Sequence, residues 1–108
     1  METQAPLELV ILALLRTPAH GYALIERMRT SSGGELDVPE GTVYPALYRL
    51  EREGLLVSAE TIVGGRRRRV YRLTPRGRSA LQKRQAAWTR ETRMINGILE
   101  GEVLRAHT

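Results

Sequence analysis

The sequence contains no cysteine and no phenylalanine, and its 108 residues include one tryptophan and two histidines. Without cysteine, the chain forms neither a disulfide nor a thiolate metal site, which is compatible with a reducing cytoplasm. Two histidines without cysteine give no support to a zinc-sensing site. We therefore expect no metal, no cofactor and a cytoplasmic location.

Long hydrophobic runs are also absent. The longest apolar run, Leu9–Leu15, is far too short to span a bilayer. Acidic residues, Glu2 and Glu8, precede it in place of the basic residues of a signal peptide. We expect a protein with no membrane segment.

Catalytic groups are equally scarce. His20 falls in a predicted turn and His107 lies next to the C-terminus. Asp37 and Glu40 lie in or beside a predicted loop with no base or nucleophile near them in sequence, and there is no glycine-rich phosphate loop. An enzyme would need a nucleophile or a metal site that this sequence does not offer.

Positive charge is abundant and unevenly distributed. The net charge is +5, but residues 1–40 hold three arginines and six acidic residues, whereas residues 41–108 hold fourteen basic and six acidic residues. This asymmetry favours a polyanionic partner. A solvated basic surface without a partner is the alternative for charge alone.

The stretch 41–56, GTVYPALYRLEREGLL, has the pattern of an amphipathic helix. Val43, Leu47 and Leu50 share one face by their spacing. Thr42 is the expected N-cap, which puts Pro45 in the first turn, and a glycine ends the helix. The opposite face carries Pro45, Tyr48, Arg49 and Arg52. The pattern fits either a recognition helix or an ordinary amphipathic helix with a solvated face.

Two further helices and a loop precede this stretch. Residues 1–6 are expected to form a tail, and Leu7–Leu15 a helix that is buried on most of its circumference, against the core and a second subunit. Thr17–Ala19 break it. His20 opens a second helix that ends at about Thr30, and the Ser31–Pro39 segment is a loop. The inward positions of the second helix are Leu24, Ile25 and Met28.

A β-hairpin is expected after the third helix. Leu55–Val63 and Arg66–Leu73 are two extended runs joined by Gly64 and Gly65. Four adjacent arginines, Arg66–Arg69, repel one another at a tight turn, whereas a phosphate backbone would accommodate them. The alternative is an edge strand protected from aggregation by its charge.

A single long helix is expected to end the chain. Thr74 is its N-cap and Pro75 its first residue, and it runs to about Leu99 or Leu104. Apolar residues recur in it at sevens, which is typical of a helix that pairs with its own copy. We assign residues 1–74 to a DNA-binding domain and residues 75–108 to a dimerisation helix and tail.

Three helices followed by a hairpin is the winged helix-turn-helix arrangement: mostly α, with a small β-hairpin. The motifs HGYALIERM, GTVYPALYRLEREGLL and GGRRRRVYRLTPRG resemble the PadR family of bacterial transcriptional regulators, in its shorter subclass. The resemblance implies a homodimeric repressor whose third helix enters the major groove of DNA. The residues that match the family's DNA-contacting segments are Tyr22, Thr42, Tyr44, Pro45, Tyr48, Arg49, Gly64, Gly65, Arg66, Arg67 and Arg68. Tyr22 matches the family's HGY turn, where its side chain either reaches a phosphate or only packs, and Tyr71 matches a wing-strand position that packs rather than binds.

Two recognition helices related by a two-fold axis would read half-sites about 34 Å apart, so the operator is expected to be an inverted repeat. Arg49 is our favoured guanine reader over Arg52, which lies in the last turn of its helix and has acidic neighbours in sequence. The dimer interface is expected to include Leu7, Val10, Leu14, Trp88, Ile95, Ile98 and Leu99.

Trp88 has two interpretations. It either packs the dimer or, as in multidrug-sensing members that the chain resembles, walls a pocket for a planar apolar effector, together with Leu9, Ala13 and Leu81. The leading functional hypothesis is an effector-released repressor that binds double-stranded DNA. A winged-helix module that binds an acidic protein and a constitutive regulator without effector are the alternatives.

Overall fold

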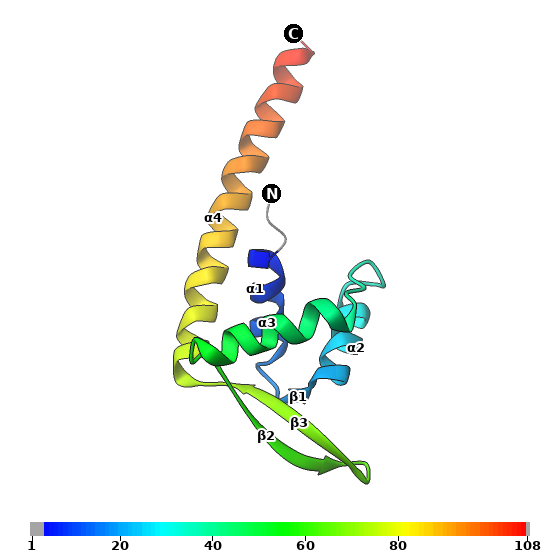
Figure 1. The fold of residues 1–108 in the computed structure, drawn as a ribbon. Helices are drawn as coiled ribbons and strands as arrows, with labels where there is room; N and C mark the ends of the chain where they lie inside the picture. The colour runs from blue at the N-terminus through cyan, green and yellow to red at the C-terminus, as the bar shows by residue number, and fades with distance from the viewer. Residues whose placement is uncertain (1–3, 108) are drawn as a thin grey trace.

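The computed structural model describes residues 4–107, which form a winged helix-turn-helix with a long C-terminal helix, as expected (Figure 1). The β-strands form a three-stranded antiparallel sheet in the order β1-β3-β2. The elements are α1 (Gln4–Leu14), β1 (Ala19–His20), α2 (Gly21–Ser31), α3 (Glu40–Arg52), β2 (Leu56–Val63), β3 (Arg66–Leu73) and α4 (Pro75–Ala106).

The core lies between the first three helices and the base of the hairpin. The predicted inward residues of α2 and α3 are buried, and Tyr71 of β3 packs at 1% exposure. From α4, Leu81 alone is buried among the apolar side chains described. Helix α4 therefore leaves the domain soon after it begins and extends the molecule to 64 × 29 × 20 Å. The buried side chains of the three helices include Ile11, Leu12, Leu15, Leu24, Ile25, Met28, Val43, Ala46, Leu47 and Leu50.

Helix α4 starts as the sequence predicts. The Thr74 hydroxyl accepts a hydrogen bond from the Gly77 N–H at 3.0 Å and donates one to the Gly54 carbonyl at 2.6 Å. A β-carbon on Gly77 would collide with the carbonyl oxygen of Leu55. The Thr-Pro-Arg-Gly sequence thus caps the helix and lets it lie against the end of α3.

The start of α3 differs from the prediction. The N-cap is Pro39, whose carbonyl accepts from the N–H groups of Thr42 and Val43 at 3.0 and 3.1 Å. Thr42 is therefore inside the helix, and our assignment of it as N-cap is wrong. Pro45 lies in the second turn, where its missing N–H leaves the carbonyl four residues earlier without its usual helical partner.

The end of α3 agrees with the prediction. Gly54 follows the helix with a φ of +79°, in the left-handed region that glycine adopts without strain. The N–H groups of Gly54 and Leu55 donate to the carbonyls of Glu51 and Leu50 at 3.0 and 2.9 Å, which is the Schellman pattern. The chain therefore turns sharply from α3 into the hairpin.

The N-terminal region contains two further differences. Residues 4–6 are helical and belong to α1, so that part of the predicted tail is wrong; residues 1–3 lie outside the described residues. The predicted break instead contains strand β1, in which Ala19 pairs with Tyr71. A two-residue strand has too little pattern of its own to be detected without its partner.

None of the helices in residues 4–107 is long and apolar enough to cross a bilayer. Within the same described region, no three histidine or carboxylate side chains gather into a group that could hold a metal ion.

Candidate nucleic-acid interface

Helix α3 presents a polar and aromatic face away from the core. Tyr48 is 55% exposed, and Thr42, Pro45 and Arg52 are exposed with it. Arg52 makes no salt bridge within residues 4–107. Its guanidinium is therefore available to a ligand that approaches this face.

Arg49 lies at the flank of that face, next to α1 and α4. Its Nε donates to Oε2 of Glu8 at 3.3 Å, and its side chain is 31% exposed. The sequence favoured Arg49 over Arg52 as the guanine reader. The structure places Arg52 outward and Arg49 in an ion pair, a difference that sequence spacing could not reveal.

Tyr44 lies at the opposite flank of α3 and covers the start of α2. A β-carbon added to Gly21 would come within 2.5 Å of the Tyr44 hydroxyl oxygen. Partial burial raises the pKa of Tyr44, and the nearby Glu40 carboxylate adds to the effect. The Tyr44 and Tyr48 rings follow each other along the helix, with centroids 6.4 Å apart.

The start of α2 adds a histidine and a second tyrosine to the same region. His20 is the N-cap of α2, and its Nδ1 accepts from the N–H of Ala23 at 3.2 Å. Its ring stacks on Tyr22, which is exposed. Burial lowers the pKa of His20, and the charges of Arg68 and Arg27 lower it further. The sequence prediction selected Tyr22 and missed His20, whose capping role depends on its place at the end of β1.

The wing is the β2–β3 hairpin, and arginines occupy its tip. Gly64 and Gly65 form the turn with φ angles of +57° and +77°, as expected for a two-residue hairpin loop. Arg66 and Arg67 beside the turn are exposed, whereas Arg68 is partly buried. The wing extends beyond α3 at the end of the molecule opposite the free end of α4 (Figure 1).

A hydrogen-bonded chain fixes the wing to α3. Arg69 Nη1 donates to the Ser58 hydroxyl at 3.2 Å, and that hydroxyl donates to Glu51 Oε2 at 2.7 Å. Arg69 therefore has a structural role, in contrast to the arginines at the tip. These three side chains link the wing to α3, in addition to the packing of the hairpin base in the core.

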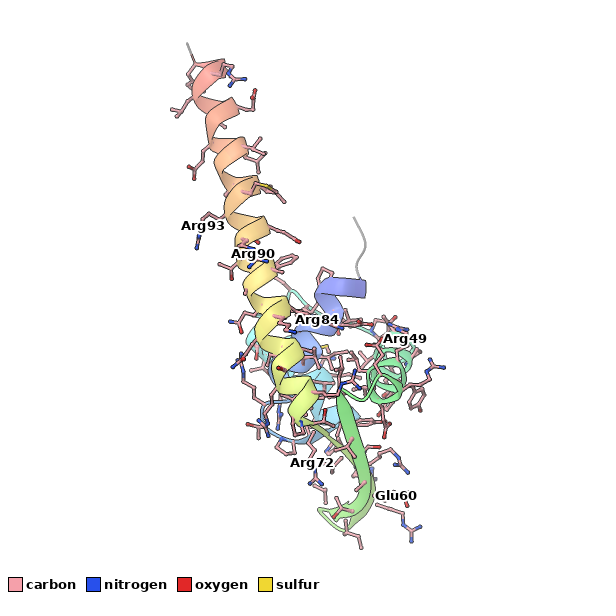
Figure 2. The ribbon with its side chains drawn as sticks, turned by 90° about the vertical axis from the view of Figure 1, so that its left-hand side faces the viewer. Arg49, Glu60, Arg72, Arg84, Arg90 and Arg93 are labelled. Carbon is pink, nitrogen blue, oxygen red and sulfur yellow. The ribbon has the colours of Figure 1, made fainter. Side chains whose placement is uncertain are left out.

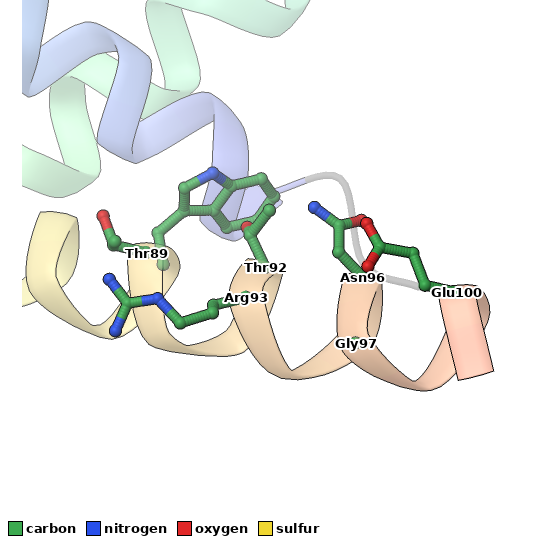
Figure 3. A pocket seen from close by; sticks show the side chains of 7 residues that line it. Thr89, Thr92, Arg93, Asn96, Gly97 and Glu100 are labelled. Atoms are coloured by element: carbon green, nitrogen blue, oxygen red, sulfur yellow. The ribbon is translucent and has the colours of Figure 1, made fainter.

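The four residues predicted to line an effector pocket do not all come together. Leu9 and Trp88 line one hollow of about 360 Å³, with Glu8, Arg84, Ala87 and Glu91. Leu81 is buried and lines a different hollow, with Arg16 and Leu73, while Ala13 packs against the core. Trp88 also borders a shallow groove of about 540 Å³ along α4 (Figure 3), lined by Thr89, Thr92, Arg93, Asn96, Gly97 and Glu100.

The predicted dimer residues fall into two groups. Leu7, Val10 and Leu14 of α1 are partly buried against the core. The α4 residues are exposed: Trp88 by 40%, and Ile95, Ile98 and Leu99 by half or more. The exposed α4 residues continue an apolar stripe that also includes Met94 and Val103.

Comparison with known proteins identifies the family. The profile of the PadR-like family of transcriptional regulators matches residues 10–83. The chain therefore belongs to this family, which consists of transcriptional regulators and not enzymes. Transcriptional regulator Rv3488 of Mycobacterium tuberculosis is 52% identical over 60 residues, which is 56% of this chain and 56% of that protein. The matched segment thus spans little more than half the length of that relative.

Solved structures show the same fold. A PadR family regulator from Eggerthella lenta is 33% identical with a TM-score of 0.78, over 87% of this chain and 81% of that one. PadR of Bacillus subtilis, solved in complex with operator DNA, is 29% identical with a TM-score of 0.64, over 71% of this chain and 45% of that one.

Proposed function

We propose that the protein is a homodimeric repressor that binds an inverted-repeat DNA operator and is released by a planar aromatic effector. The observation that carries the proposal is the pairing of the outer face of α3 with an arginine-tipped wing. Hydrogen bonds through Ser58 link the wing to α3. The operator complex of the Bacillus subtilis relative supports the same use of this fold. Such a regulator acts in the cytoplasm, where the chromosome lies.

Within this proposal, residues 1–74 bind DNA. Tyr48 and Arg52 face the major groove from the exposed side of α3, and Arg49 joins them from its flank. Arginine reads guanine through O6 and N7, and arginines at the wing tip contact phosphates without reading sequence. Tyr22 contacts the DNA backbone from the start of α2, beside the recognition helix.

Residues 75–108 provide the dimer interface. The exposed apolar stripe of α4 has no cover within the described chain, and a second copy would bury it on the same stripe. A two-fold axis between the helices then sets the spacing of the two half-sites. The effector binds in the hollow between Trp88 and Leu9, where α4 meets α1. A change in the contact between α4 and α1 alters the spacing of the two recognition helices.

The proposal is tested by the binding of the purified protein to duplex DNA from upstream of its own gene, at two salt concentrations and with unrelated DNA as competitor. We expect a specific complex with a steep salt dependence, and a dimer by analytical ultracentrifugation. Ile95→Glu should give monomers with much weaker operator binding. A monomeric wild-type protein, or one that binds no duplex in dilute buffer, would refute the proposal. Operator binding that no aromatic compound changes would instead indicate a constitutive regulator.

A further inference from the structure

Glu8 lies where α1, α3 and α4 meet. Its Oε2 accepts from Nε of Arg49 on α3, and its Oε1 accepts from Nη1 of Arg84 on α4, both at 3.3 Å. The Glu8 side chain is only 15% exposed. Arg84 points from α4 toward the region of Arg49 (Figure 2). A carboxylate that is largely removed from water depends on such partners. Glu8 thus links α4 to α3, with one carboxylate oxygen accepting from each helix.

The contact with Glu8 leaves the reading end of Arg49 free. Only Nε of Arg49 is engaged, and its two terminal amino groups have no hydrogen-bond partner within residues 4–107. A guanidinium held through Nε presents those amino groups as a fork, the geometry that suits guanine or a phosphate. Arg52 has no such support. Glu8 thus holds Arg49 in an orientation that favours bidentate contact.

The same carboxylate also belongs to the hollow beside Trp88. That hollow is lined by two acidic residues, Glu8 and Glu91, and one basic residue, Arg84. Glu91 makes no salt bridge in the described part of the chain, so its negative charge is not compensated by a neighbouring side chain. The indole of Trp88 offers an aromatic face, to which cations are attracted. The charge and the aromatic ring together fit a planar organic cation.

We propose that Glu8 positions Arg49 for reading DNA, and that a planar organic cation in the Trp88 hollow draws the Glu8 carboxylate away from it. Operator affinity then falls because Arg49 loses its fixed orientation. Arg84 keeps a second partner in Glu53, at 3.7 Å, so the displacement of Glu8 leaves Arg49 as the unpaired cation. By thermodynamic reciprocity, the operator weakens binding of the cation by the same factor. This inference rests on the DNA-binding function proposed above.

The DNA arm of the test compares Glu8→Gln with Glu91→Gln, which removes the same charge from the same hollow without touching α3. We expect Glu8→Gln to lose roughly tenfold or more in operator affinity, because a homodimer makes the weakened bidentate contact twice, with no loss on unrelated duplex. Glu91→Gln should bind both duplexes like the wild type. Because Glu8 acts through Arg49, Glu8→Gln combined with Arg49→Ala should be no weaker than Arg49→Ala alone. Equal weakening on both duplexes, or additive losses, would overturn the proposal.

The ligand arm uses N-methylquinolinium, with 1-methylnaphthalene as its uncharged isostere and titration of DNA alone as a blank. The cation should lower the operator affinity of the wild type severalfold, and the isostere should have a smaller effect. Glu91→Gln should bind the cation more weakly by calorimetry but still respond to it. Glu8→Gln should not respond. The inference fails if Glu8→Gln responds like the wild type, or if the wild type does not respond.

Failure of the inference can be distinguished from failure of the proposed function. If the wild type binds no duplex, both fail together. If it binds its operator specifically and Glu8→Gln matches it, only the inference fails. Thermal unfolding checks that each variant is folded. Should Glu8→Gln fold poorly, Glu8→Asp takes its place, because it keeps the charge but shortens the reach, and the same loss of operator specificity is expected.

Discussion

The hydroxyl of Tyr44 lies directly over the α-carbon of Gly21, in the space that any larger side chain at residue 21 would occupy. This contact joins two motifs that are far apart in the sequence, His20-Gly21-Tyr22 and the start of α3. It lets α3 approach the N-terminus of α2 closely at this point. The ring of Tyr48 lies near that of Tyr44, with ring centroids 6.4 Å apart.

Gly21→Ala should displace the Tyr44 ring and weaken operator binding. The added methyl group would contact the ring at 2.5 to 2.8 Å, so we expect a loss of stability of about 1–3 kcal/mol, as for an overpacked site. Urea unfolding measures the loss, and fluorescence anisotropy with operator DNA measures binding. Wild-type stability in the variant would show that Tyr44 is free to move.

Gly77→Ala and Gly97→Ala make a matched pair within α4. The Gly77 site meets the Leu55 carbonyl, which is backbone and cannot move aside cheaply, whereas a β-carbon on Gly97 meets nothing within 4 Å. We expect Gly77→Ala to destabilise the protein by about 1–3 kcal/mol or more. Gly97→Ala should stabilise α4 by up to about 1 kcal/mol, since alanine is the better helix former. The same sign for both in thermal unfolding would contradict the account.

Arg27 should be more important for stability than Arg29, two positions away. Arg27 Nη1 donates to the carbonyls of Leu14 and Thr17 at 3.0 and 2.7 Å, and Nη2 donates to Pro18 at 3.2 Å. Arg27→Met should cost about 1.5–3 kcal/mol because it leaves these carbonyls without a charged donor. Arg29→Met removes only exposed ion pairs, which water and salt screen, and should cost clearly less than Arg27→Met. Denaturant unfolding of the two variants decides; equal losses would refute the prediction.

His20 should make stability depend on pH. The folded state lowers its pKa, first by burial, and the free Nδ1 lone pair is needed for the cap. The folded state therefore favours the neutral ring. Its contribution is complete well above the ordinary value of 6.5 and is lost as pH falls through the lowered folded pKa. Asparagine caps helices without titrating, so His20→Asn should lose less stability than the wild type between pH 7.5 and 5. Equal losses in urea unfolding would contradict this.

Local patterns in the sequence were sufficient to predict most of the fold. The spacing of Val43, Leu47 and Leu50 gave α3, the Gly-Gly turn gave the wing, and Thr74-Pro75 gave the start of α4. The N-cap of α3 was mispredicted because Thr42 is a common capping residue, whereas the actual cap uses a backbone carbonyl. Strand β1 was missed because its two residues are extended only through pairing with β3.

The candidate interface was harder to predict from the sequence, because ion pairs between residues far apart in the chain determine which arginines lack an intramolecular partner. Arg49 and Arg52 differ by three positions on one helix, yet only Arg49 reaches Glu8 on α1. Arg69 belongs to the same arginine run as the wing tip but is bound to Ser58. His20 caps α2 because it lies at the end of β1, and the sequence did not predict that strand.

The most direct test of the central claim, that α3 and the wing bind duplex DNA, is the salt dependence of operator affinity in a wing variant. Arg66→Gln/Arg67→Gln/Arg68→Gln removes three charges at the tip. Lys83→Gln/Arg90→Gln/Arg93→Gln removes three from exposed positions on α4, of which Figure 2 shows Arg90 and Arg93. Each phosphate contact contributes about 0.9 to the slope of log K against log salt, and a homodimer presents two wings, each with three substituted arginines, so the wing variant should lose roughly five units of slope. The α4 variant should keep the wild-type slope. An unchanged slope in the wing variant, or an equal fall in both, would contradict the account.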